Sequence, residues 1–175
     1  MSLYEINYKL EVSRKILFNK LEYNKCENLL DVLDLSSGDY LPTSKMIGGQ
    51  YKVYGGGGVT EYTHNEYNVA FETLGIGRVG ARCGCVFIID KYSWITDNAL
   101  YAKSINENFD IKFLKHYLNF LHLNQFSSQT AQPVISKKKI KHIRIPVNDY
   151  SEQKKLGEIL ETIENNNNNI ELAEE

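Results

Sequence analysis

The stretch TLGIGRVGARCGCVFIIDKYSWITDNALYAK, Thr73 to Lys103, decides the fold class of this protein. Its glycine-rich first half leads into the short apolar run VFII, and the turn-forming residues DKYS separate that run from a further apolar segment. Short apolar runs bounded by Gly, Asp and Ser are typical of strands joined by turns. The stretch therefore predicts a β-hairpin at the centre of the chain.

A second glycine-rich turn is predicted upstream, in YKVYGGGGVTEY, Tyr51 to Tyr62. Four consecutive glycines permit backbone conformations that other residues resist, so we expect a loop or turn between two strands here. Before it, LLDVLDL (29–35) alternates in part at the period of a strand, and SSGDYLP (36–42) supplies turn residues. These segments extend the β-rich region toward the N-terminus.

The segment FDIKFLKHYLNFLHLNQF, Phe109 to Phe126, predicts an amphipathic helix, because its apolar residues recur at a period of 3.6. The polar loop SSQTAQPVIS, Ser127 to Ser136, follows it. We expect Ser136 to cap a helix of one or two turns in KKKIKHI, and RIPV to be extended because Ile145 precedes a proline.

Both ends of the chain predict amphipathic helices. The N-terminal one is expected from about Leu3 to Tyr23, with an apolar stripe of Leu3, Ile6, Leu10, Leu17 and Leu21. The C-terminal one is expected to start near Tyr150, because Asp149 and Glu152 resemble a capping box. Its spacing predicts a coiled-coil seam with one polar position, made of Leu156, Leu160, Ile163, Asn167 and Ile170. The five asparagines at 165–169 also fit a low-complexity tail, since Asn is a poor helix former.

The predicted fold class is α+β. A globular domain at 24–148 with a mostly antiparallel or mixed sheet is expected to be flanked by helices of coiled-coil type at 1–23 and 149–175. The length of 175 residues and the 42% hydrophobic content suit one such domain with a sizeable core.

Charge and hydropathy narrow the classes of function. A net charge of −2 gives no overall basic character, so any contact with nucleic acid must come from local patches. No apolar run approaches the roughly 20 residues that span a bilayer, and the first residues lack the features of a signal peptide. We therefore expect a cytoplasmic protein, with Cys26, Cys83 and Cys85 as free thiols.

The motif GIGRVG, Gly75 to Gly80, matches the dinucleotide-binding pattern GxGxxG. That function needs a helix directly after the last glycine, whereas ARCGCVFIID is predicted to continue as strand. The four-glycine segment likewise lacks the Gly-Lys-Ser/Thr ending of a phosphate loop. Nucleotide binding is thus the weaker interpretation, and a glycine-rich hairpin is the stronger one.

The sequence predicts no catalytic residues, no metal site and no cofactor. A strand would place Cys83 and Cys85 on one face, but Cys26 and scattered histidines add no second paired motif for zinc. The four histidines are not near a Ser or Cys in a nucleophile motif, so we expect them on the surface or on a helix face. They are His64, His116, His122 and His142.

Polar residues suited to DNA recognition remain. Arg78 and Arg82 lie in the glycine-rich hairpin, and a basic run follows the polar loop that holds Gln129 and Thr130. Such side chains contact phosphates and base edges, although a basic run is also typical of a solvated face. The run consists of Lys137, Lys138, Lys139, Lys141 and Arg144.

Taken in order, seven segments resemble the target recognition domain of a type I restriction-modification specificity subunit, from about Leu29 to Ile163. They are LLDVLDLSSGDYLP, YKVYGGGGV, GRVGARCGCVFIIDKYSWITDNALY, LKHYLNFLHLNQF, SSQTAQPVIS, IKHIRIPV and EQKKLGEIL. The most specific pieces are Thr-Ala-Gln-Pro at 130–133, Thr-Asp-Asn-Ala at 96–99 and Glu-Gln-Lys-Lys at 152–155.

The resemblance implies a non-catalytic subunit that reads one half of a split DNA target. Its implied partners are an adenine methyltransferase, which uses S-adenosylmethionine, and a translocating restriction endonuclease. Family members commonly carry two recognition domains joined by a helical spacer, whereas 175 residues hold one. The chain would then be a half-length subunit that pairs with a second copy, a fragment or a relic, and we expect a homodimer.

The resemblance also assigns roles to the loops. SSQTAQPVIS is expected to join the central helix to the sheet, and base contacts are expected from the loop at Tyr54 to Thr60 and the strand at Arg78 to Arg82. The predicted DNA-binding residues are Tyr54, Thr60, Arg78, Arg82, Gln129, Lys137, Lys138 and Lys139. The alternative is a protein interaction module that acts through its terminal helices, with merely solvated basic loops.

Overall fold

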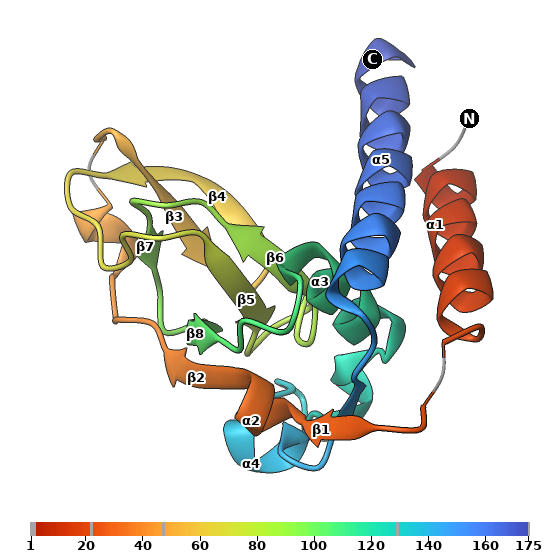
Figure 1. The fold of residues 1–175 in the computed structure, drawn as a ribbon. Coiled ribbons are helices and arrows are strands. Elements are labelled where there is room, and N and C mark those ends of the chain that lie inside the picture. The colour runs from red at the N-terminus through yellow and green to blue at the C-terminus, as the bar shows by residue number, and fades with distance from the viewer. Residues whose placement is uncertain (1–2, 22, 47, 129, 175) are drawn as a thin grey trace.

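The computed structural model describes residues 3–21, 23–46, 48–128 and 130–174, with the side chains of 3, 4, 6, 7 and 167–174 left aside. The described residues form an α+β fold, as predicted, in which strands form three sheets and helices cover one side of the largest (Figure 1). None of the described helices has the length and apolar character needed to cross a bilayer.

The central hairpin is confirmed. Strand β5 (Thr73–Gly77) pairs antiparallel with β6 (Val86–Ile89), and Gly75 lies opposite Phe87. On its other side β5 pairs with β8 (Ala99–Ile105), which in turn pairs with β2 (Leu33–Ser37), so the sheet has the order β2-β8-β5-β6 with every pair antiparallel.

The four-glycine segment is a turn between two strands, as predicted. Strands β3 (Tyr51–Gly55) and β4 (Gly58–His64) form an antiparallel hairpin whose turn is Gly56 and Gly57. Gly58 has a φ of +104°, a value that favours glycine. The short strand β7 (Trp94–Ile95) pairs in parallel with β3 and completes a second sheet.

A third, two-stranded sheet joins the two ends of the segment 24–148. Strand β1 (Cys26–Asn28) pairs antiparallel with β9 (Arg144–Pro146), which confirms the extended RIPV segment. Because the two strands precede and follow the rest of the domain, this pairing brings the end of helix α1 (Leu3–Phe18) near the start of helix α5 (Tyr150–Glu174).

Short helical turns connect these strands. The segment 29–35 alternates only in part at the period of a strand, and its first residues, Leu29–Val32, form the single-turn helix α2 before β2 begins. Leu29 and Val32 lie on one face of that turn and are both buried, so tertiary packing overrides the partial strand pattern. The other short elements are the 3-10 turns η1 (Thr43–Lys45) and η2 (Leu123–Phe126) and helix α4 (Lys137–Ile140).

Helix α4 begins after Ser136, as predicted, but the side chain of Ser136 does not cap it. The backbone of Ser136 is extended, and its side chain makes no capping hydrogen bond. Its carbonyl oxygen instead accepts the backbone N–H of Lys139 at 2.9 Å.

The segment after Gly80 also differs from the prediction. Residues 81–84 form turns, in which Cys83 N donates to Gly80 O at 3.0 Å and Cys85 N donates to Arg82 O at 3.0 Å. Gly80 and Gly84 have φ values of +84° and +90°, which a strand does not allow. Cys83 and Cys85 therefore do not share a strand face, and neither a strand nor a helix follows the GIGRVG motif directly.

The central helix is confirmed as α3 (Ile111–Phe120). Asp110 caps it, because its Oδ1 accepts the backbone N–H of Phe113 at 2.9 Å. Phe113, Leu114 and Leu118 of this helix are fully buried in the main apolar core.

Helix α1 is shorter than expected, ending at Phe18 instead of near Tyr23. Its most buried side chains are Leu10, Arg14 and Phe18, with Leu17 partly buried beside them. Phe18 contacts three aromatic rings at centroid distances of 5.9, 5.4 and 5.4 Å, namely Phe113, Tyr117 and Phe120. The side chains of Leu3 and Ile6, two members of the predicted apolar stripe, are not among those that the structure describes.

Helix α5 begins where the capping pattern predicted. Oδ1 of Asp149 accepts the backbone N–H of Ser151 at 2.9 Å and that of Glu152 at 3.4 Å. The five asparagines at 165–169 belong to this helix rather than to an irregular tail. In Figure 1, α1 and α5 lie side by side, run in opposite directions and point away from the sheets.

Leu160 of α5 belongs to the protein's own core, which corrects part of the predicted coiled-coil seam. Leu160 is 0% exposed and lies in the same cluster as Phe18, Phe113 and Leu118. It cannot face a second copy without opening this core, so its assignment to an intermolecular seam is wrong. Leu156 and Ile163 are partly buried, and the side chains of Asn167 and Ile170 lie outside the description.

Candidate nucleic-acid interface

Four segments that are distant in sequence meet at one edge of the four-stranded sheet. In the loop between β5 and β6, Arg78 N donates to Asn98 O at 2.9 Å, and Arg78 O accepts from Ile135 N at 2.9 Å. Val79 forms a β-bridge with Val134, and Cys85 Sγ lies 3.4 Å from Gly56 O. We call this meeting point the loop cluster; it joins 78–85, the Gly56–Gly57 turn, the turn before β8 and the end of SSQTAQPVIS.

Glycines allow these backbones to approach each other. A Cβ atom on Gly77 would lie 2.1 Å from the carbonyl oxygen of Gly56, and one on Gly56 would lie 2.9 Å from the carbonyl oxygens of Val79 and Asn98. No side chain fits at such distances. Gly77 of GIGRVG and Gly56 of the four-glycine turn thus serve close backbone packing, and Gly80 has a φ of +84° that favours glycine, so these glycines have structural roles without a nucleotide.

A shallow basic groove of about 290 Å³ lies beside the loop cluster. Arg78 is half-buried in it, with Nη1 donating to Ser37 Oγ at 3.2 Å, while its Nε is buried without a partner among the described residues. Lys137 Nζ donates to Leu35 O at 2.8 Å. The groove is lined by Ser37, Arg78, Leu100, Ser136, Lys137 and Lys138.

The structure thus brings several predicted residues together. Lys138 is exposed, and so is Arg82, whose Cγ would lie 3.3 Å from a Cβ on Gly57 in the hairpin turn. Arg78, Arg82, Lys137 and Lys138 surround one loop cluster, and Lys139 is half-buried next to them. Arg78 is only partly exposed, because Ser37 and its own loop enclose part of its side chain.

Two other predicted contacts are internal. Tyr54 is 4% exposed, its ring stacks on Phe87 with centroids 6.0 Å apart, and its hydroxyl accepts the backbone N–H of Asp90 at 3.3 Å. Burial raises the pKa of this phenol. The Thr60 hydroxyl donates to Val53 O at 2.9 Å within its own hairpin. The strand pairing directs both side chains to contacts within the protein. The prediction that Tyr54 contacts DNA is wrong, because its side chain is buried.

The SSQTAQPVIS loop is held by its own hydrogen bonds. Ser128 N donates to Val134 O at 3.0 Å, Val134 N donates to Ser128 Oγ at 2.9 Å, and the Thr130 hydroxyl donates to Gln132 O at 2.6 Å. Gln129 lies outside the described residues. The loop connects η2 to α4 and contacts the β5–β6 loop, so it supports the loop cluster.

A group of exposed tyrosines was not predicted. The ring of Tyr67 lies 5.1 Å from Tyr51 and 5.2 Å from Tyr92, and Lys91 Nζ is 5.9 Å from the Tyr92 ring. The three tyrosines are separated from one another by 16 or more positions in a chain that holds 12 tyrosines, so no local pattern marks them.

A buried set of charged residues joins α1, α3 and α5, and sequence reasoning missed it as well. Arg14 donates to His116 Nδ1 from Nε at 3.3 Å and from Nη2 at 3.1 Å. His116 Nε2 lies 3.1 Å from Glu161, and Lys115 pairs with Glu161 at 2.5 Å and also with Glu164. We call Arg14, Lys115, His116, Glu161 and Glu164 the polar junction.

His116 lies on a face of α3, one of the two positions expected for it, and it is fully buried there. Since arginine can only donate, Nδ1 must be the unprotonated nitrogen, and Nε2–H then donates to Glu161. Burial lowers the pKa of His116, and the nearby Arg14 and Lys115 lower it further against the opposing effect of Glu161. The imidazole is therefore neutral at pH 7.

The polar junction also contains the one described group that resembles a metal site. Ligand atoms of His116, Glu161 and Glu164 lie within 4.8 Å of one another. However, Arg14 and the Nε2 proton engage both nitrogens of His116, and Lys115 bridges both carboxylates. Burial would raise the pKa of Glu161, but hydrogen bonds from His116 and Lys115 outweigh it and bring the pKa to about 2. These residues thus fit an ion-pair network better than a metal.

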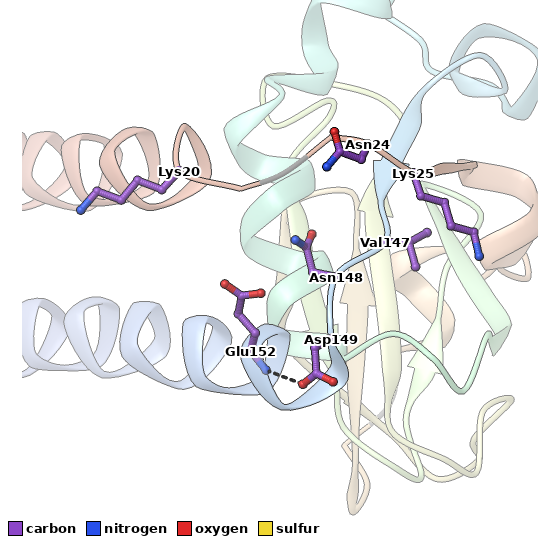
Figure 2. Close-up of a pocket in the computed structure, with 7 residues that line it drawn as sticks. All are labelled: Lys20, Asn24, Lys25, Val147, Asn148, Asp149 and Glu152. Carbon is purple, nitrogen blue, oxygen red and sulfur yellow. Dashed lines mark hydrogen bonds between the residues drawn. The ribbon is translucent and has the colours of Figure 1, made fainter.

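A further polar cavity of about 470 Å³ lies between the end of α1 and the start of α5. Figure 2 shows Lys20, Asn24 and Lys25 at and after the end of α1, and Asn148, Asp149 and Glu152 at the start of α5. Asp149, which caps α5, lines this cavity. The cavity therefore belongs to the region where α1 and α5 connect to the sheets.

The fold and the loop cluster define a small α+β domain that presents basic loops at one edge and a helical pair at the other. Residues 23–175 match the family model described as the type I restriction modification DNA specificity domain. The chain belongs to this family.

Individual relatives agree with this assignment. The chain is 26% identical over 151 residues to the specificity subunit of the type I restriction enzyme EcoprrI from Escherichia coli, covering 83% of this chain and 37% of that protein. Its fold matches the S subunit of a type I restriction-modification system from M. genitalium with a TM-score of 0.78 at 20% identity, over 97% of this chain and 50% of that one. The HsdS subunit from Thermoanaerobacter tengcongensis gives a TM-score of 0.66 at 16% identity, over 98% and 46%. The chain thus spans half or less of these relatives' lengths.

Proposed function

We infer that this chain reads one half of a split DNA target through the loop cluster. The observation that carries this function is the convergence of Arg78, Arg82, Lys137 and Lys138 from two distant segments onto one surface of a specificity-domain fold. Lysine and arginine position a protein on phosphates, and arginine also reads guanine edges. A local basic surface of this kind lets a chain with a net charge of −2 approach DNA.

In this proposal the chain performs no chemistry. It directs a partner adenine methyltransferase, and in a full complex a restriction endonuclease, to the target. Support comes from the family, whose model is described as a DNA specificity domain.

The second recognition domain would be supplied by a second copy. Apolar side chains remain open on the helical pair: Ile159 of α5 is 39% exposed beside a groove that includes Ile163, and Ile16 of α1 is 53% exposed. A homodimer would pair these faces and present two recognition domains to inverted half-sites.

Two measurements test the proposal. DNA affinity of the chain with its methyltransferase should fall steeply as salt rises, because phosphate contacts release counterions. Methylated adenines mapped in host DNA, with and without this chain, should reveal a split target that depends on it. The alternative, a protein interaction module, predicts salt-insensitive binding through the helices and an unchanged methylation map, and that outcome would overturn DNA recognition.

A further inference from the structure

The polar junction is placed where the helical pair leaves the recognition domain. Arg14 comes from α1, Lys115 and His116 come from α3, and Glu161 and Glu164 come from α5. Helix α3 packs on the main sheet, while α1 and α5 project away from it side by side (Figure 1). The junction therefore connects the two projecting helices to the body of the domain.

Its contacts are directional. The two N–H groups of Arg14 converge on one nitrogen of His116, at 3.3 and 3.1 Å, and the opposite nitrogen meets Glu161 at 3.1 Å. Glu164 also lies 3.8 Å from Arg14, so Arg14 contacts both α3 and α5. Hydrogen bonds weaken steeply when their angles change. The junction thus restricts the orientation of the helices relative to α3.

A small change of orientation has a large effect at the far end of α5. Beyond Glu161, α5 continues to Glu174, which corresponds to roughly 20 Å at about 1.5 Å per residue. A rotation of about 10° at the junction would displace the far end by about 3.4 Å, which is about one base-pair step. The separation of two recognition domains joined by such helices depends on this angle.

We propose that the polar junction is a spacing determinant: Arg14, His116 and Glu161 hold the helical pair at one angle to the recognition domain, and this angle sets the number of base pairs between the two half-sites. This inference rests on the proposed function. The three side chains are positioning residues, since they act on the target through the helices and do not contact DNA.

The test replaces directional contacts by apolar packing. In the triple variant Arg14→Met, His116→Leu and Glu161→Met, the Lys115–Glu164 pair stays intact and one charge of each sign is removed. Replacing a buried ionic group by apolar residues of similar size is often tolerated, so we expect a folded protein. The matched control is His116→Gln, whose amide can accept from Arg14 and donate to Glu161.

The readout is methylation of a plasmid library that carries the wild-type half-sites separated by spacers of increasing length, in cells that express the partner methyltransferase. The wild-type chain and His116→Gln should methylate one spacing. The triple variant should methylate the same half-site sequences at neighbouring spacings as well, with a severalfold rise relative to the wild-type spacing. A merely structural role would lower methylation at every spacing alike.

Each outcome is decisive. A triple variant that is folded by circular dichroism and keeps the single wild-type spacing overturns the inference and leaves the proposed function standing. A wild-type chain that directs methylation to no split target overturns the proposed function itself. If the triple variant does not fold, Arg14→Lys replaces it, because it keeps the charge but loses the paired N–H groups on His116; an unchanged spacing in that variant also overturns the inference.

Discussion

The guanidinium of Arg14 donates two hydrogen bonds to Nδ1 of His116, a residue 102 positions away in the sequence. This contact requires the neutral imidazole, because a protonated Nδ1 would present a hydrogen to the arginine donors. The contact between α1 and α3 is therefore tied to the protonation state of one buried side chain, which is surrounded by Arg14, Lys115, Glu161 and Glu164.

The free energy of unfolding should fall as the pH decreases below about 6.5. The pKa of His116 is lowered in the folded protein from 6.5, so between these two pKa values the unfolded chain binds a proton that the folded chain does not. Stability is thus full above the unfolded pKa and is lost as the pH falls toward the folded one. Urea unfolding at pH 7, 6 and 5 measures this, and His116→Gln should flatten the dependence. An equal pH dependence in both proteins would contradict the assignment.

Leu160→Ala should lower the free energy of unfolding by about 2 to 5 kcal/mol, because it creates a cavity in a fully buried cluster. The matched control is Ile159→Ala on the same helix, since Ile159 is 39% exposed. We expect that control to keep the stability of the folded monomer but to weaken self-association, as measured by sedimentation. Equal losses of stability in the two variants would show that the buried and exposed faces of α5 are wrongly assigned.

Gly77→Ala should disrupt the loop cluster, because the new methyl group would lie 2.1 Å from the carbonyl oxygen of Gly56. Overpacking of this kind costs about 1 to 3 kcal/mol or more. Gly48→Ala is the control, since nothing lies within 4 Å of its added Cβ. Thermal unfolding of the two variants tests the close approach; a Gly77→Ala protein as stable as Gly48→Ala would rule it out.

Arg82→Ala and Lys138→Ala should weaken DNA binding without unfolding the domain, because both side chains are exposed at the loop cluster. A phosphate contact should reduce affinity for all sequences alike and lower the salt slope by about 1, whereas a base contact should cost about 1 to 3 kcal/mol and relax one target position. Lys154→Ala, exposed on α5, is the charge-matched control. If all three variants bind like the wild type at every salt concentration, the DNA surface lies elsewhere.

Local patterns in the sequence determined most of the elements. The period of the apolar residues predicted α3, Asp149 marked the start of α5, and the glycines marked both hairpin turns, because each of these signals depends on residues within a few positions of one another. The ordered segments also pointed to the specificity-domain family, and Arg78, Arg82, Lys137 and Lys138 were recognised as candidates from their position in loops.

What the sequence could not determine depends on which distant segments meet. Tyr54 directly precedes a glycine-rich turn signal that suggests a surface loop, yet strand pairing turns its ring toward Phe87. Leu160 fits a coiled-coil seam by its spacing, but the packing of α5 on α3 and α1 takes it into the core. Arg14, His116 and Glu161 lie in three helices whose separate patterns give no sign of a shared buried network. Tertiary structure decided these roles, because burial and hydrogen-bond partners are set by residues far apart in the chain, whereas helix and turn propensity is set by neighbours.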